Sequence, residues 1–402
     1  MRILHTADWH LGKKLYHYSR LEEQKEVLKE IVQIAKSKSV DVILVAGDLF
    51  DTFNPSNDAT ELLYKTLKNL ARNAQVPVIA IAGNHDSPDR INVADVLARE
   101  SGIIFIGHPT DVVKEFEIEG GFKVNKSEVG FLEIELPKYN YPIRILHTAF
   151  ANEVRLKEYF GQDKQASLQD SLQEKWQRLA AIYCDDQGVN VLTTHLFMQK
   201  RGGEKLEEPD GEKPLNIGNA DLIYSDAIPE SIQYAALGHL HAYQDVGIHQ
   251  PVVYSSSPLQ YSFSEAGQQK YVAVIDVEPG KMVEIERVPL ASGQQLVRKT
   301  FTSVEETVSW LQENPNTLVE LTIQTDEFLK AEERKQILQA HEGIIYMIPI
   351  IKNLTGQEST SHSIDLSKDI HALFVDYFKL RNGGQSPNEE LIELFNEIKS
   401  AT

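Results

Sequence analysis

The sequence predicts a layered α/β domain, followed by a smaller α/β unit and a helical tail. Short continuous apolar runs, which are typical of buried parallel strands, recur along the first part of the chain. Stretches with apolar residues at helical spacing separate these runs. Alternation of this kind favours sheets covered by helices, because strands that are apolar on both faces must be covered on both sides.

Six apolar runs are expected to form the strands of the first domain. They cover residues 2–7, 41–47, 76–83, 143–149, 189–194 and 234–238. The predicted helices between them cover residues 20–38, 57–71 and 167–183.

One short string, RILHTA, occurs twice, at residues 2–7 and 144–149. We expect each copy to form a central strand, one in each half of a two-layered sheet. His5 and His147 lie inside these strands, so we interpret them as core histidines and not as ligands.

The pattern changes after about residue 250. Three further runs, at 251–263, 270–277 and 281–290, are expected to be consecutive antiparallel strands that complete the first domain. Residues 291–352 show a β-α-β-α-β order. Residues 353–402 begin as a polar linker and end in two amphipathic helices. The expected domains are therefore 1–290, 291–352 and 353–402.

Composition limits the classes of protein that fit. A chain of 402 residues, 42% of them apolar, can hold two or three domains. No apolar run reaches the roughly eighteen residues of a membrane span, and the first residues read as a strand, so no leader peptide is expected. The single cysteine, Cys184, fits a reducing cytoplasm and excludes a metal site built on several thiolates. A formal charge of −19 argues against an extended nucleic-acid surface.

Polar side chains with metal-binding chemistry follow five of the predicted strands. They are Asp8 and His10; Asp48 and Asp51; Asn84, His85 and Asp86; His195; and His239 with His241. Each group alone is as well explained by a turn or by buried histidines. Ligand sites of α/β proteins, however, form beyond the carboxyl ends of parallel strands, where neighbouring loops meet. The coincidence of all five groups at such an edge indicates a site.

The residue types favour particular metals. Carboxylate, amide and imidazole ligands without thiolate suit Mn²⁺ or Fe²⁺, with Zn²⁺ also possible and Mg²⁺ less natural. The set is large enough for two ions. Two such ions about 3.5–4 Å apart can clamp a phosphoryl group and activate water.

The ordered set D-x-H, GD, GNHD, H and GHLH resembles the calcineurin-like metallophosphoesterase superfamily. The stretches HTADWHLG and SSPLQYSFSEAG are similar to its SbcD branch, the bacterial counterparts of the meiotic-recombination-eleven nucleases. This resemblance covers residues 1 to about 278. It implies a layered β-sandwich flanked by helices, with a small α/β DNA-capping domain and a C-terminal helical tail.

The resemblance also implies roles for residues. Asp8, His10, Asp48 and His241 would hold one metal, most naturally Mn²⁺, while Asp48, Asn84, His195 and His239 would hold the second. His85 would lie beside the scissile phosphate and assist the leaving oxygen. Asp51 stands where other members often carry a histidine, so a catalytic role shared with His85 stays open. Asp86 is interpreted as a turn residue or a support for the ligands.

The resemblance implies a nuclease that cuts double-strand ends and hairpins in DNA repair. Its partner would be SbcC, an SMC-like ATPase, in an assembly of two nuclease and two ATPase subunits. Basic residues in the loops after ligand strands could bind DNA: Lys13, Lys14, Arg20 and Arg201. The tail residues expected to dock on the ATPase are Phe374, Tyr377, Phe378, Leu391 and Phe395, although packing on their own domain is an equal alternative.

Dimerisation and two rival functions complete the expectations. Residues 61–71 and 91–100 are candidate helices for a homodimer of nuclease domains. A nucleotide or small-molecule phosphodiesterase of the same superfamily is one rival. A catalytically idle adaptor that recruits the ATPase is the other, and the complete ligand set argues against it.

Overall fold

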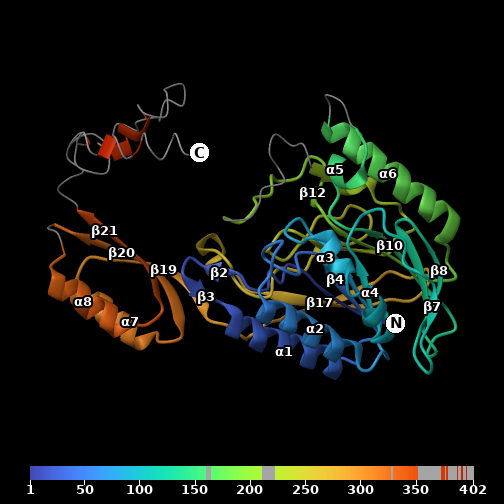
Figure 1. The fold of residues 1–402 in the computed structure, drawn as a ribbon, viewed down its shortest axis with the longest axis horizontal. Coiled ribbons are helices and arrows are strands. Elements are labelled where there is room, and N and C mark those ends of the chain that lie inside the picture. Colours follow the sequence, from blue (N-terminus) through green and yellow to red (C-terminus); the bar gives the residue numbers. More distant parts are fainter. Residues whose placement is uncertain are drawn as a thin grey trace. The chain divides into compact units, whose positions relative to one another are not determined.

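The structure is a computed structural model in which part of the chain is described (Figure 1). The described residues are 1–159, 164–210, 222–326 and 329–351, with 373–375, 377, 378, 387, 391, 392 and 395. The chain divides into two compact units, Met1–Ile323 with Lys330–Ile348, and Gln324–Leu329 with Pro349–Thr402. The domain boundaries at 290 and 352 stay predictions.

A six-stranded sheet holds the first half of the predicted strands. Its order is β18 (Glu284–Pro289), β17 (Tyr271–Asp276), β1 (Arg2–Thr6), β4 (Val42–Ala46), β5 (Val78–Ile81) and β6 (Ile103–Ile106). Strands β1, β4, β5 and β6 are parallel, and β17 and β18 add antiparallel strands at one side. The carboxyl ends of β1, β4 and β5 therefore share one edge.

An eight-stranded sheet holds the second half. Its order is β15 (Gln244–Asp245), β16 (Val252–Tyr254), β14 (Tyr234–Gly238), β11 (Val189–His195), β10 (Ile143–Thr148), β9 (Phe131–Glu135), β8 (Lys123–Glu128) and β7 (Phe116–Glu117). Strands β10, β11, β14 and β16 are parallel. The expectation for 251–263 was wrong in part: only β16 forms there, parallel to β14, and the chain then enters a 3₁₀ turn, η3 (Phe263–Glu265).

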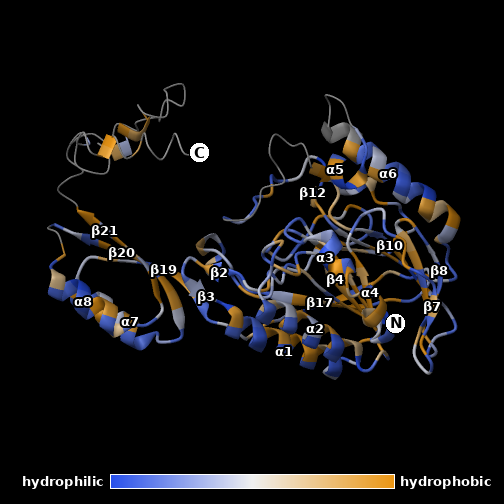
Figure 2. Cartoon of the chain, in the orientation of Figure 1, coloured by the Kyte–Doolittle hydropathy of each residue, from blue (hydrophilic) through white to orange (hydrophobic). Residues whose placement is uncertain are grey.

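Helices cover the outer faces of both sheets (Figure 1). Helices α1 (Leu21–Ser37) and α2 (Asn57–Ala71) lie over the six-stranded sheet, and α6 (Lys164–Tyr183) lies over the eight-stranded one. Hydrophobic residues gather on the strands between these helices, as Figure 2 shows. Helix α2 begins where the Ser56 side chain accepts a hydrogen bond from the Ala59 N–H. The layered α/β sandwich that the sequence predicts is confirmed.

Shorter elements occur in the loops. They are β2 (Lys14–Leu15), β3 (Tyr18–Ser19), β12 (Phe197–Gln199), β13 (Leu222–Tyr224), α3 (Pro88–Asn92), α4 (Asp95–Glu100), α5 (Glu153–Leu156) and η2 (Ser225–Ala227).

The smaller α/β set also has the predicted order. It contains β19 (Gln295–Phe301), α7 (Val304–Glu313), β20 (Thr317–Thr325), α8 (Ala331–Ala340) and β21 (Ile344–Ile351). The three strands form one sheet, with β20 in the centre.

The two RILHTA copies form equivalent strands, β1 and β10, in different sheets, as expected. Both strand histidines are fully buried. Burial lowers the pKa of His5 to about 3 and that of His147 to about 4, so both rings are neutral core groups.

The predicted linker and most of the tail lie outside the described residues. Among the helices that the structure describes, none combines the length and apolarity needed to cross a bilayer.

Candidate metal centre

The first ligand loops leave the carboxyl ends of β1 and β4 side by side. The Asp8 N–H donates to the Gly47 carbonyl at 3.0 Å, and the His10 N–H donates to the Asp48 carbonyl at 2.9 Å. These hydrogen bonds continue the pairing of β1 with β4 beyond the sheet. They place the Asp8, His10 and Asp48 side chains together, all fully buried.

The eight-stranded sheet brings its histidines to the same place. His195 is the last residue of β11, and it is in register with Gly238 at the end of β14, just before His239 and His241. The backbone N–H of His239 donates to Asp8 Oδ1 at 2.9 Å. Residues that are separated by 231 positions in the sequence thus join the two sheets at one edge.

Four of the predicted ligands have left-handed backbone conformations. The φ angles are 55° for Asp8, 44° for His10, 49° for Asp48 and 110° for His239. Such conformations cost about 1–3 kcal/mol per residue and cluster at functional sites. The packing of the two sheets must therefore offset this strain.

Glycines let the two sheets approach closely at this edge. A Cβ atom on Gly238 would lie 1.8 Å from the Ala46 carbonyl oxygen, and one on Gly47 would lie 2.1 Å from His195 Nδ1, in both cases across the two sheets. Within the six-stranded sheet, a Cβ atom on Gly83 would lie 2.1 Å from Asp48 Oδ1. The glycine that precedes each ligand in GD, GNHD and GHLH is therefore a packing requirement as well as a turn residue.

Substitution of Gly238 tests this packing. Gly238→Ala would force β14 away from β4, so we expect the free energy of unfolding to fall by about 1–3 kcal/mol. The matched control is Gly203→Ala, where the nearest atoms lie at 3.2 Å in an exposed loop, and a change below about 0.5 kcal/mol is expected. Urea unfolding of the metal-free protein measures both. Equal effects of the two substitutions would contradict the close approach.

The predicted ligand atoms of several side chains lie close to one another. His195 Nδ1 donates to the Ala46 carbonyl at 2.9 Å, so in the neutral ring Nε2 carries the lone pair. That Nε2 lies 2.8 Å from Asn84 Oδ1 and 3.3 Å from Asp48 Oδ2. His10 Nε2 similarly lies 3.1 Å from His241 Nε2 and 3.5 Å from Asp48 Oδ2. Lone pairs at these distances repel unless a proton or a metal cation lies among them.

Two buried atoms of this cluster have unused bonding capacity. Asp8 Oδ2 and His239 Nδ1 make no hydrogen bond to any residue that the structure describes. Asp8, His10 and Asp48 also have ligand atoms within 4.8 Å of one another, close enough to hold one ion. The residues present therefore fit a metal centre made of oxygen and imidazole ligands.

The electrostatics of the cluster favour a positive charge beside Asp48. Burial raises the pKa of Asp8 to about 7. Burial also acts to raise the pKa of Asp48, but the neighbouring histidines, His195 above all, hold it well below its usual range. The pKa of His195 rises to about 9, because the Asp48 carboxylate outweighs the opposing effect of burial. The Asp48 carboxylate that favours the protonated form of His195 would also stabilise a bound cation.

His85 lies beside the cluster and is held through backbone groups. Its N–H donates to Asp48 Oδ1 at 2.9 Å, and its ring Nδ1 donates to the backbone carbonyl of Asp51 at 2.8 Å. The Asp51 carboxylate is 4.0 Å from the same Nδ1 and lies nearer to Lys13 Nζ, at 3.1 Å. Its pKa is lowered to about 2, because His10 and Lys13 outweigh burial.

Asp86 organises two ligand loops. Its buried carboxylate accepts hydrogen bonds from the backbone N–H groups of Leu49, Phe50 and Gly83, at 2.8–3.0 Å. These donors belong to the loops that follow β4 and β5. The geometry agrees with the interpretation of Asp86 as a support for the ligands.

The segment that follows the second RILHTA copy supports the GNHD loop. After β10, Asn152 caps α5 by accepting a hydrogen bond from the Arg155 N–H at 2.9 Å. The Arg155 guanidinium then donates to the carbonyls of Gly83 and Asp86 at 3.0 and 2.9 Å. The first copy thus ends in predicted ligands, and the second ends in a segment that holds their loop.

Sequence reasoning missed two carboxylates at the centre. Glu208 Oε1 lies 2.6 Å from His239 Nε2, and Glu265 Oε1 lies 3.2 Å from His241 Nδ1. Glu265 has a local signal, because Ser262 and Glu265 form a capping box. Glu208 has none, because it lies in a loop with mixed charges.

The residues predicted to bind DNA differ in exposure. Lys14 is exposed, and the exposed Arg201 pairs with Asp226 at 2.6 Å. The prediction for Arg20 was wrong: it is fully buried, with its guanidinium bonded to Glu23 and to the carbonyl of Gln260. Lys13 is also largely buried.

Three of the five tail residues predicted to bind the ATPase contact one another. Phe374 stacks on Phe395 with ring centroids 4.2 Å apart, and Phe378 lies 6.2 Å from Phe374. Tyr377 and Leu391 are exposed. The described parts of the two predicted helices therefore pair through their aromatic residues.

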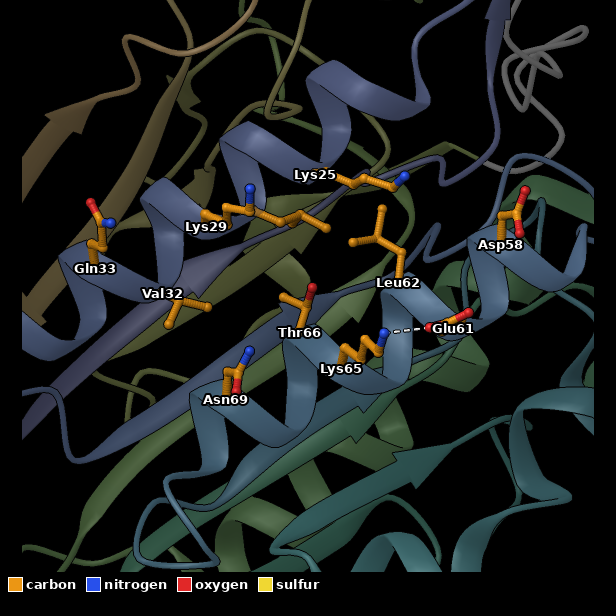
Figure 3. A pocket seen from close by; sticks show the side chains of 11 residues that line it. Lys25, Lys29, Val32, Gln33, Asp58, Glu61, Leu62, Lys65, Thr66 and Asn69 are labelled. Carbon is orange, nitrogen blue, oxygen red and sulfur yellow. Dashed lines mark hydrogen bonds and ion pairs between the residues drawn. The ribbon is translucent and has the colours of Figure 1, made fainter.

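A groove of about 470 Å³ lies between α1 and α2 (Figure 3). Its rim carries charges of both signs, including the Lys65–Glu61 ion pair. It contains none of the predicted metal, catalytic or DNA-binding residues.

Known proteins resemble this chain over all or most of its length. The model of the calcineurin-like phosphoesterase family matches residues 1–243. The SbcD subunit of the SbcCD nuclease from Bacillus subtilis (strain 168) is 34% identical over 410 residues, which cover 100% of this chain and 98% of that protein. Its namesake from Staphylococcus epidermidis (strain ATCC 12228 / FDA PCI 1200) is 30% identical over 296 residues, covering 74% and 71%.

Proposed function

Because the chain belongs to the calcineurin-like phosphoesterase family and is homologous to SbcD nuclease subunits over its full length, we propose that it is a metal-dependent DNA nuclease. Its activities would be double-strand exonuclease and single-strand or hairpin endonuclease, in repair and recombination. One observation carries this proposal: ligand residues from the carboxyl ends of strands in both sheets converge on Asp48.

The proposed ligands divide into two sets that share Asp48. The first set is Asp8, His10, Asp48 and His241; the second is Asp48, Asn84, His195 and His239. Mn²⁺ is the proposed metal in both, because oxygen and imidazole ligands without thiolate suit it. The ions would polarise the phosphodiester and lower the pKa of water.

His85 is the proposed general acid. Because Nδ1 of His85 donates to the Asp51 carbonyl, Nε2 is the ring nitrogen that we propose acts at the phosphate. Protonated at Nε2, the ring can give that proton to the leaving oxygen. The Asp51 carboxylate would act indirectly, through its contacts with Lys13 and His10 at 3.1 and 3.6 Å.

The test uses the full chain together with its ATPase partner, ATP and linear duplex or hairpin DNA. Cleavage that requires Mn²⁺ and stops with EDTA is expected. Hydrolysis of a small chromogenic phosphodiester with no cleavage of DNA would favour the rival phosphodiesterase. Normal DNA repair by an Asn84→Ala variant would favour the adaptor.

The proposed partner is SbcC, since the relatives are named as parts of SbcCD. We propose an assembly of two nuclease and two ATPase subunits in the cytoplasm. Docking would use the exposed Tyr377 and Leu391 next to the stacked pair Phe374 and Phe395. Lys14 and Arg201 remain the exposed candidates for DNA phosphates.

The homodimer is proposed to form through α4 and the residues just before it. Val93, Val96 and Leu97 are 83%, 68% and 77% exposed, an unusual concentration of apolar surface. The outward face of α2, the other candidate, is polar and carries the Lys65–Glu61 ion pair.

Leu97→Glu should therefore dissociate the dimer of nuclease subunits. An unpaired carboxylate in the interface costs about 3 kcal/mol or more, so the dimer Kd should rise at least about 100-fold. Light scattering after size exclusion measures the mass. Asn69→Glu, on α2, adds the same charge and should leave the dimer intact. Dissociation by Asn69→Glu alone would place the interface on α2.

A further inference from the structure

The two histidines of GHLH bond carboxylates through opposite ring nitrogens. His241 Nε2 lies 3.1 Å from His10 Nε2, while its Nδ1 faces Glu265 at 3.2 Å. In His239 the arrangement is reversed. Its Nε2 lies 2.6 Å from Glu208, and the buried Nδ1 makes no hydrogen bond to any described residue. A carboxylate therefore occupies the outer nitrogen of each ring.

We propose that Glu265 and Glu208 are positioning residues that fix the ring orientation and tautomer of His241 and His239 for the two metals. The inference rests on the proposed function. A carboxylate that accepts a hydrogen bond from the outer N–H keeps the lone pair on the inner nitrogen and raises the basicity of the ligand. Loss of such a partner typically lowers metal affinity about 10–100-fold.

Glu265 is built into the core for this role. Its Oε1 accepts hydrogen bonds from the backbone N–H groups of Tyr261 and Ser262 at 3.1 and 3.0 Å. Its Oε2 pairs with the buried Lys270 Nζ at 2.6 Å, and the same Nζ donates to the His241 carbonyl at 2.8 Å. Both oxygens of the Glu265 carboxylate are thus held in place by groups other than the His241 ring.

This arrangement assigns a purpose to a motif that the metal ligands leave unexplained. Glu265 belongs to SSPLQYSFSEAG, the stretch that is similar to the nuclease branch. The stretch supplies no proposed ligand. It instead supplies the carboxylate, the capping serine and the turn that fix one ligand.

Glu208 reaches the centre from a different kind of element. It lies in the loop after β12, close in sequence to the basic residues Lys200, Arg201 and Lys205. Its side chain is 13% exposed, against 2% for Glu265. The pairing of Glu208 with His239 therefore links the position of a candidate DNA-binding loop to one metal ligand.

Calorimetric titration of the metal-free full chain with Mn²⁺ tests the proposal. Wild type should bind two ions. Glu265→Gln and Glu208→Gln should each weaken one of the two sites about 10–100-fold and leave the other unchanged. Glu207→Gln, at the exposed neighbouring position, is the control and should bind both ions as wild type does.

A second variant distinguishes a loss of protein stability from a loss of ligand positioning. Glu265→Gln leaves the buried Lys270 without its charged partner, so the double variant Glu265→Gln with Lys270→Met removes both charges. With the Tm of the metal-free protein restored, this variant should still bind one Mn²⁺ weakly. The visible spectrum of bound Co²⁺ should also change, because it reports ligand geometry.

The outcomes distinguish this inference from the proposed function. Failure of wild type to bind Mn²⁺ would overturn the proposed function. Two wild-type sites, with unchanged affinities in Glu208→Gln and in the double variant, would overturn the positioning roles alone.

Discussion

Asp48→Ala is expected to abolish both Mn²⁺ binding and DNA cleavage. Asp48 is the residue that both proposed ligand sets share, and one of its carboxylate oxygens lies 3.3 Å from His195 and 3.5 Å from His10. Alanine leaves those imidazoles with no anion between them. We expect cleavage to fall by at least about 10³-fold, since removal of even one stabilising donor at an active site can cost 10²–10³.

Calorimetry with Mn²⁺ and cleavage of linear duplex DNA measure the two losses. Asp89→Ala is the matched control, because its exposed carboxylate lies near the same loops but faces solvent. It should keep both properties. The metal-free Tm of each variant is compared to exclude misfolding. Cleavage by Asp48→Ala within about tenfold of wild type would contradict the shared-ligand role.

His85→Gln should separate metal binding from cleavage. The backbone N–H of residue 85 would still donate to Asp48 Oδ1, so both ions should bind with nearly unchanged affinity. The imidazole that can carry a proton to the leaving oxygen is lost. Loss of a general acid typically costs about 10²–10⁴-fold in rate, and we expect a cleavage defect in this range.

Asp51→Asn is the informative comparison. It keeps the backbone carbonyl that accepts the His85 Nδ1 hydrogen bond at 2.8 Å and removes only the carboxylate charge. A defect clearly smaller than that of His85→Gln is therefore expected. Equal defects would assign the Asp51 carboxylate a direct part in protonation. Normal cleavage by His85→Gln would refute its catalytic role.

The positions of the main strands along the chain, and the sheet edge where the chemical groups gather, could be predicted from the sequence. Buried parallel strands are apolar on both faces, so β1, β4, β5, β10, β11 and β14 appear as continuous runs. Parallel strands also end at a common edge, which made the polar groups that follow them informative together. Strand β8, by contrast, is mostly polar and half-buried, so it shows no apolar run.

Properties that depend on distant partners could not be predicted. Arg20 lies in a basic stretch of sequence, but its burial depends on Gln260, which is 240 positions away. No local sequence feature distinguishes Glu208 from other acidic residues in loops. Its proposed role depends on its contact with His239. The left-handed backbone of Asp8, His10 and Asp48 follows from the packing of two sheets, and no local residue pattern specifies it.

The most direct test of the dinuclear centre is anomalous diffraction from crystals soaked in Mn²⁺. We predict two peaks about 3.5–4 Å apart, on either side of the Asp48 carboxylate and flanked by His10 and His195. A single peak, or peaks that lie away from Asp48, would contradict the assembly of one metal centre from both sheets.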